Sequence, residues 1–277
     1  MKAFDIYYEP ESYYKSFEQF AKNLSSELMQ TDNHPETIIS LVPSLTELLF
    51  DLGLGEKVIG RTRFCVHPKD KIESVPIVGG TKNPRLEKIR ELNPGLIIAN
   101  KEENRQEDVE ELERDFNVLV TKIGTIEEAL FAIHDIGWKC GVQDQATSLI
   151  HDIQREMERV PDEHVMKAAY FIWRDPWMSV GNDTYIHSVM NHWKLDNVYA
   201  NKKRYPKTSL HELSLKKPDL ILLSSEPYPF KEKHIKEVGD ACPGSNVVLA
   251  NGEWFSWYGS RMLKTFRHLN VFRRAIS

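Results

Sequence analysis

The chain has few cysteines and no long apolar run. Its three cysteines, Cys65, Cys140 and Cys242, are too few and too widely spaced for a disulfide framework or a zinc knuckle. We therefore expect reduced, unpaired thiols. No segment approaches the roughly 18 consecutive apolar residues that a transmembrane helix needs, so no membrane span is predicted.

Positive charge is not in excess. The sequence holds 36 basic and 41 acidic residues, which gives a formal net charge of −5. A surface that binds nucleic acid usually shows a basic excess or a basic run, and the densest basic spot here is only Arg273-Arg274. We predict no nucleic-acid partner.

The N-terminal segment lacks the pattern of an export signal. A secretory leader needs an unbroken apolar run of roughly 7–15 residues, whereas residues 1–36 are polar and aromatic. Helical spacing at Tyr14, Phe17 and Phe20 predicts that these residues form an N-terminal extension. Without an export signal, a cytoplasmic location is a serious alternative to a periplasmic one.

Familiar catalytic motifs are also missing. There is no Gly-x-Ser-x-Gly elbow, Walker loop, Gly-x-Gly-x-x-Gly fingerprint or His-Glu-x-x-His pair. Cys65 and His67 would suit a nucleophile or a metal pair, with Glu102 for acid–base work, but no third partner follows from the sequence. We predict no catalytic residue, no metal site and no catalytic cofactor.

The chain does contain an alternation of short β-branched runs and amphipathic stretches. The runs fall at 38–42, 96–99 and 117–120, and, in a second series, at 168–173, 220–223 and 247–250. Strands that alternate with helices predict parallel sheets with helices on their faces.

The longest helical stretch, 143–160, lies between the two series and stops at Pro161. We predict an α/β fold of two Rossmann-like lobes with parallel sheets, joined by one long helix, with the ligand cleft between the lobes. The predicted parts are the extension 1–36, an N-terminal lobe 37–141, the linking helix 142–161 and a C-terminal lobe 162–277.

Aromatic and basic residues gather in the loops that follow the predicted strands, where parallel sheets bind ligands. Aromatic faces suit a planar or macrocyclic ligand, and arginines pair with carboxylates or phosphates. Ser44 and Glu47, after the first strand, are interpreted as a helix capping box. The predicted ligand-binding residues are Arg63, Phe64, Lys82, Asn83, Lys101, Asn104, Arg174, Trp177, Glu226, Trp254, Trp257, Tyr258 and Arg261.

Four segments together resemble a known family. They are IISLVPSLTELLFDLGLGEKVIG from Ile38, VPIVGGTKNPRLEKIRELNPGLIIANKEENRQEDVEEL from Val75, WRDPWMSVG from Trp173 and GEWFSWYGSR from Gly252. In this order they resemble the helical-backbone substrate-binding proteins of ABC importers, and they are most similar to the cobalamin-binding branch. The resemblance implies two α/β lobes joined by a rigid helix and a periplasmic location. It also implies capture of a corrinoid, haem or a ferric siderophore between the lobes.

The resemblance also implies roles for single residues. Phe64, Trp177 and Trp254 match ligand-facing aromatic positions, and Glu87 and Glu212 match the glutamates, one per lobe, that dock onto the permease. The branch's tryptophan before the first-lobe helix is missing, because Val78-Gly79-Gly80-Thr81 stands there.

We therefore predict a monomeric, non-enzymatic substrate-binding protein of an ABC importer. Its partners would be a permease and a small-molecule ligand, a corrinoid or a related metal chelate. One alternative is a binder of an anionic ferric siderophore or of haem, because the predicted cleft is basic. For haem, Tyr258 or His67 would be the axial ligand. Another alternative is a cytosolic corrinoid-handling protein or enzyme that uses Cys65, His67 and Glu102. A third is a protein-interaction module without a small ligand.

Overall fold

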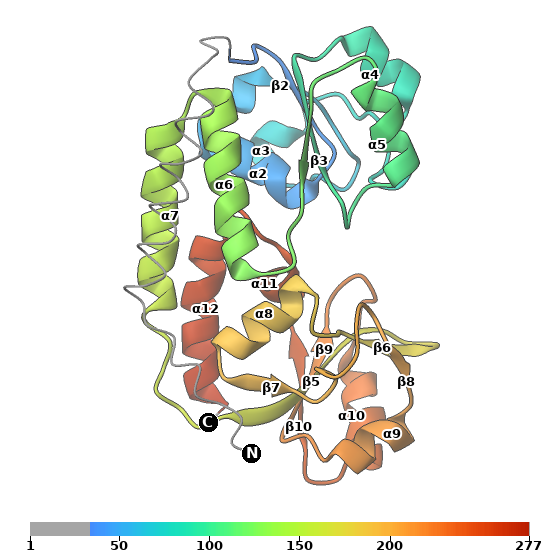
Figure 1. Ribbon diagram of the computed structural model, residues 1–277. Helices are drawn as coiled ribbons and strands as arrows, with labels where there is room; N and C mark the ends of the chain where they lie inside the picture. Colours follow the sequence, from blue (N-terminus) through green and yellow to red (C-terminus); the bar gives the residue numbers. More distant parts are fainter. Residues whose placement is uncertain (1–33, 277) are drawn as a thin grey trace. The chain divides into compact units, whose positions relative to one another are not determined.

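The computed structural model describes residues 34–276, so most of the predicted extension 1–36 lies outside the described residues. From Pro35 onward the chain forms one compact unit with two separate sheets (Figure 1). We call the part around the four-stranded sheet the first lobe and the part around the six-stranded sheet the second lobe.

The sheet of the first lobe is entirely parallel, with the strand order β2-β1-β3-β4. Its central strands are fully buried because helices cover both faces, which explains their continuous apolar runs. The strands are β1 (Ile38–Ser40), β2 (Val58–Arg61), β3 (Leu96–Asn100) and β4 (Val118–Thr121). The helices are α2 (Pro43–Asp51), η1 (Gly55–Lys57), α3 (Lys69–Ile72), α4 (Leu86–Leu92), α5 (Gln106–Glu113) and α6 (Ile126–Cys140).

The sheet of the second lobe has the order β10-β9-β5-β6-β8, and β7 pairs with β5. The strands are β5 (Met166–Trp173), β6 (Trp177–Ser179), β7 (Leu195–Asn197), β8 (Lys207–Thr208), β9 (Leu220–Ser224) and β10 (Asn246–Ala250). The helices are α8 (Tyr185–His192), α9 (Leu210–Lys216), α10 (Glu232–Ala241), α11 (Glu253–Ser256) and α12 (Arg261–Ala275).

Strand pairing in the second lobe differs in part from the prediction of parallel sheets. Strands β5, β7, β9 and β10 are parallel, whereas β6 pairs antiparallel with both β5 and β8. For the β5–β6 pair the physical reason is the short connection 174–176, since a parallel crossover needs a dozen or more residues. The α/β fold of two lobes is confirmed, with a mixed sheet in the second lobe.

The predicted long helix is α7 (Gln143–Met157), which packs against α6 and α12. It buries Ala146, Ile150 and Ile153 on one stripe, in agreement with the apolar spacing. It follows Gly141, whose φ of 76° ends α6 in the left-handed conformation. Among residues 34–276, no helix is long and apolar enough to cross a bilayer. The boundaries at 37, 142 and 162 remain predictions.

Candidate ligand-binding site

A cavity of about 550 Å³ is lined by both lobes, and its volume is typical of a small-molecule site. We call it the main cavity. Its first-lobe lining is Val42, Pro43, Ser44, Phe64, Val66, Thr81 and Glu103. Its second-lobe lining is Tyr170, Ile172, Ile186, Tyr205, Glu226, Pro227, Glu253, Ser256, Trp257 and Tyr258.

A side cavity of about 310 Å³ shares part of this wall, including Glu103, Tyr205 and Tyr258, and adds Lys101 and Arg204. Most lining residues stand at or just after the carboxyl ends of β1, β2, β3, β5, β9 and β10. The alternating strands and helices thus bring loops distant in sequence to one place, as open parallel sheets generally do.

The aromatic wall of the main cavity is held in place by its neighbours. Trp257 donates its indole N–H to Glu226 Oε1 at 3.0 Å. The guanidinium of Arg261 lies 4.9 Å from the centre of the Trp257 ring, and the His67 ring meets the Trp257 ring edge-on at 5.4 Å. By contrast, Phe64 is 54% exposed, so its ring is available to contact a ligand. The cavity therefore has one fixed aromatic side and one uncovered ring.

Glu226 supplies a carboxylate from the second lobe. It accepts hydrogen bonds from Ser256 Oγ at 2.7 Å and from Trp257 Nε1 at 3.0 Å. Gly252 permits this arrangement, since a Cβ there would lie 2.3 Å from Glu226 Cγ. Burial raises the pKa of Glu226, and the nearby charge of Glu253 raises it further.

Glu103 supplies a carboxylate from the first lobe and lines both cavities. Its backbone N–H donates to Asn100 Oδ1 at 3.3 Å. Burial raises the pKa of the Glu103 carboxyl, Lys82 opposes that rise, and the charges of Glu102 and Glu226 add to it. The two lobes thus present acidic groups to the same space.

Arg261 was predicted to bind the ligand, but it is occupied by protein carboxylates. It donates to Glu47 at 2.7 and 2.6 Å in a bidentate pair, and to Glu253 at 2.8 Å. The capping-box interpretation of Ser44 and Glu47 is therefore wrong. Helix α2 starts after Val42 without a side-chain cap, and the Glu47 carboxylate faces Arg261 across the lobes.

A second ion pair joins the lobes at the side cavity. Arg204 donates to both carboxylate oxygens of Glu102, and the Tyr205 hydroxyl donates to Glu102 Oε1 at 3.0 Å. The Arg204 side chain is 57% exposed, whereas that of Arg261 is only 12% exposed. The two pairs therefore differ strongly in their access to water.

Other predicted ligand residues belong to the structure of the second lobe. Arg174 pairs with Glu237 at 2.9 Å and lies over the Trp177 ring. Trp177 stacks on Phe230 at 5.7 Å and packs against the hydrophobic core. Trp254 instead meets the ring of His268 at 5.1 Å. None of these rings lines either cavity.

Some of the remaining predicted residues line a cavity, and others lie outside both linings. Asn104 is buried and donates to Leu41 O and Thr81 O, so it braces loops. Lys82 donates to a backbone carbonyl. The main cavity contains the predicted residues Phe64, Glu226, Trp257 and Tyr258, and the side cavity contains Lys101 and Tyr258. Outside both linings lie Arg63, Lys82, Asn83, Asn104, Arg174, Trp177, Trp254 and Arg261.

Sequence reasoning missed several lining residues. Glu103 stands in the loop after β3 and Ser256 in the short helix α11 after β10, and the sequence does not show the directions of their side chains. Tyr205 stands before β8, a strand of two residues that produces no periodicity in the sequence. Tyr170 lies inside β5, where an apolar run suggested a purely structural strand.

The residues proposed for an enzymatic alternative do not meet. Cys65 Sγ is buried within 3.1 Å of Thr46 Oγ1 and 3.2 Å of Thr62 Oγ1, and burial raises the pKa of its thiol. His67 lies 3.4 Å from Glu253, and Glu102 is held by Arg204. Within the described part of the chain, no group of three or more His, Cys, Asp or Glu could hold a metal ion.

The two glutamates matched to permease docking occupy the first turns of α4 and α9. Glu87 is highly exposed and pairs with Arg90 at 2.9 Å. Glu212 accepts a hydrogen bond from Thr208 Oγ1 at 3.0 Å and is partly buried.

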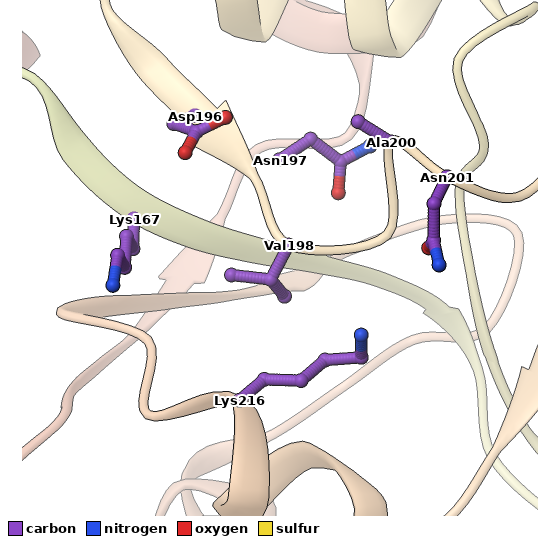
Figure 2. A pocket seen from close by; sticks show the side chains of 7 residues that line it. All are labelled: Lys167, Asp196, Asn197, Val198, Ala200, Asn201 and Lys216. Carbon is purple, nitrogen blue, oxygen red and sulfur yellow. The ribbon is translucent and has the colours of Figure 1, made fainter. Parts of the chain in front are cut away.

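A further hollow of about 370 Å³ lies near the amino end of β5. Figure 2 shows its lining, with Lys167 and Lys216 among the labelled side chains. It contains no aromatic residue, and the Lys216 ammonium lies 4.9 Å from the ring of Tyr199. It is separate from the carboxyl ends of the strands, where the two cavities lie.

Comparisons with known proteins agree with this architecture. The model of a family described as periplasmic binding protein matches residues 38–241. An uncharacterized ABC transporter substrate-binding lipoprotein of Bacillus subtilis strain 168 is 26% identical over 202 residues, which are 68% of this chain and 63% of that protein. The chain thus spans less than two thirds of that relative's length.

A vitamin B12-binding protein of Vibrio parahaemolyticus is 26% identical over 208 residues, which are 72% of this chain and 74% of that protein. The crystal structure of the periplasmic vitamin B12 binding protein of Vibrio cholerae superposes with a TM-score of 0.76 at 21% identity. This superposition covers 87% of the present chain and 98% of the other, and it shows a shared fold.

Proposed function

Because the chain belongs to the periplasmic binding protein family, we propose that it is the substrate-binding component of an ABC importer and captures a corrinoid between its lobes. The names of two relatives, an ABC transporter substrate-binding lipoprotein and a vitamin B12-binding protein, support the class of function. In this role the protein holds its ligand and passes it to a permease without chemical conversion.

The lining of the main cavity is the observation that favours a corrinoid. It combines aromatic and apolar side chains with the hydroxyls of Ser44, Thr81 and Ser256. Its charged residues are Glu103, Glu226 and Glu253, and it includes no lysine or arginine. A corrin is a broad macrocycle whose rim bears carboxamides, and these donate hydrogen bonds that carboxylates accept. An anionic siderophore or the propionates of haem would instead require free arginines or lysines.

The two residues considered as axial ligands for haem, Tyr258 and His67, are poorly suited to that role. Burial raises the pKa of the Tyr258 hydroxyl well above its ordinary value, and the charge of Glu103 adds to the rise. A phenolate ligand to ferric iron needs the opposite shift. His67 lies against Glu253 and the edge of the Trp257 ring. These contacts support the corrinoid over haem.

For delivery, we propose that Glu87 and Glu212 contact the permease, one from each lobe. Both lie in helix first turns, and neither lines the main or the side cavity. We further propose that the protein acts as a monomer on the outer side of the cytoplasmic membrane.

Titration of the purified protein with cyanocobalamin, haemin and a ferric siderophore tests the ligand class. We expect saturable quenching of tryptophan fluorescence, corrected for inner-filter absorption, by cyanocobalamin alone. Trp257→Ala should abolish saturable binding, measured by calorimetry, because its ring forms the cavity wall. Trp254→Ala is the matched control and should retain binding, because its ring packs on His268.

Binding of haemin or the siderophore without any corrinoid binding would overturn the proposed ligand. Loss of binding in Trp254→Ala together with normal binding in Trp257→Ala would show that the ligand occupies another surface.

A further inference from the structure

The cavity has an acidic character that the proposed function alone does not require. Resting on that function, we propose that Glu103 and Glu226 select the ligand by charge. They favour a cationic corrinoid, whose cobalt carries a water molecule, over the neutral form whose cobalt carries cyanide. The substrate class is therefore a positively charged corrinoid.

The geometry places one carboxylate on each side of the ligand space. Glu103 follows β3 in the first lobe, and Glu226 follows β9 in the second. Asn100 Oδ1 accepts hydrogen bonds from the backbone N–H groups of Glu102 and Glu103 at 2.8 and 3.3 Å. These bonds fix the turn at residues 100–103, which follows β3. Ser256 and Trp257 fix Glu226. A ligand between the lobes would meet both carboxylates.

The two arginines near these carboxylates are engaged by other acids, whereas Lys101 lines the side cavity beside Glu103. Arg261 is shared between Glu47 and Glu253, and Arg204 is paired with Glu102. The Lys82 ammonium donates to the Glu102 carbonyl and only partly offsets the burial of Glu103. The hydrogen bonds that the structure assigns to Glu103 involve its backbone, and its carboxylate has none. The lining of the main cavity therefore holds Glu103, Glu226 and Glu253 and no lysine or arginine to offset them.

A bare metal ion does not fit this arrangement. The carboxylates come from opposite lobes, and in residues 34–276 no cluster of three or more metal-ligating side chains exists. Most of the rest of the wall is aromatic or apolar. An organic cation large enough to contact both lobes matches the lining, because it gains apolar burial and neutralises the carboxylates together.

The test compares aquacobalamin with cyanocobalamin, which differ in the charge at cobalt while sharing the corrin and its amides. Dissociation constants are measured at neutral pH by calorimetry for the wild type, Glu103→Gln, Glu226→Gln and the control Glu113→Gln. Glu113 is exposed at the end of α5. We expect the wild type to prefer aquacobalamin about tenfold, which corresponds to about 1.4 kcal/mol.

Glu103→Gln should bring this ratio close to one, and Glu226→Gln should lower it, whereas Glu113→Gln should keep the wild-type ratio. A second arm needs no variant. At alkaline pH the cobalt-bound water loses a proton, so the ligand becomes neutral and the wild-type preference should disappear.

Equal binding of the two corrinoids by the wild type would overturn the proposal. So would a ratio unchanged in Glu103→Gln, the result expected if His67 replaced the cobalt-bound water and caused the preference. The visible spectrum of the bound corrinoid would reveal that replacement. Absence of binding by either corrinoid would instead refute the proposed function itself, so the two failures are distinct.

Discussion

Replacement of Arg261 by methionine should strongly destabilise the protein. The side chains of Arg261 and Glu47 are only 12% and 15% exposed, and burial already raises the pKa of Glu47 despite its pairing with the arginine. Arg261→Met would leave Glu47 buried without a counter-charge and would remove the partner of Glu253 as well. Loss of one partner from a buried ion pair costs about 3–5 kcal/mol in the free energy of unfolding.

Urea unfolding followed by far-ultraviolet circular dichroism measures this loss. In thermal unfolding, Tm should fall by about 10 °C, because a chain of this size loses about 2–4 °C per kcal/mol. The matched control is Lys236→Met, which breaks an exposed pair with Asp240 and should change little.

The loss in Arg261→Met should shrink as pH falls. An acid whose pKa is raised in the folded state favours folding more once it is protonated, and without Arg261 the pKa of Glu47 rises further. A loss below about 1 kcal/mol at neutral pH, the value of a surface pair, would show that water reaches this network and would refute the reasoning.

Two further predictions concern the other glutamates. Glu103→Gln should raise the free energy of unfolding at neutral pH, because an amide removes a buried charge. Wild-type stability should increase as pH falls through the raised pKa of Glu103, and urea titrations at several pH values should show a weaker increase in the variant. The double variant Glu87→Gln, Glu212→Gln should bind ligand normally but lower uptake of labelled corrinoid by cells that depend on this protein. Normal uptake would contradict the docking role.

Much of the fold could be predicted because burial imposes continuous patterns. The run Leu96-Ile97-Ile98-Ala99 is buried on both faces of a sheet, and the stripe of α7 repeats with the helical period. The strands β6, β7 and β8 were missed, because strands of two or three residues contain too few positions for a period.

The site could be predicted only to the level of its loops. Trp177 and Trp257 both stand in loops after strands, yet one ring packs on Phe230 and the other lines the cavity. The sequence does not show the direction of a ring, which depends on tertiary packing. The pairing of Arg261 could not be predicted for a related reason, since the carboxylate that it contacts lies 214 positions away in the chain.

The two arginine–glutamate pairs between the lobes differ in strength. Arg204 and Glu102 are partly open to water, so salt and solvent can compete for them, whereas Arg261 and Glu47 are shielded. If a force separated the lobes, the Arg204–Glu102 pair beside the side cavity would therefore break before the shielded Arg261–Glu47 pair.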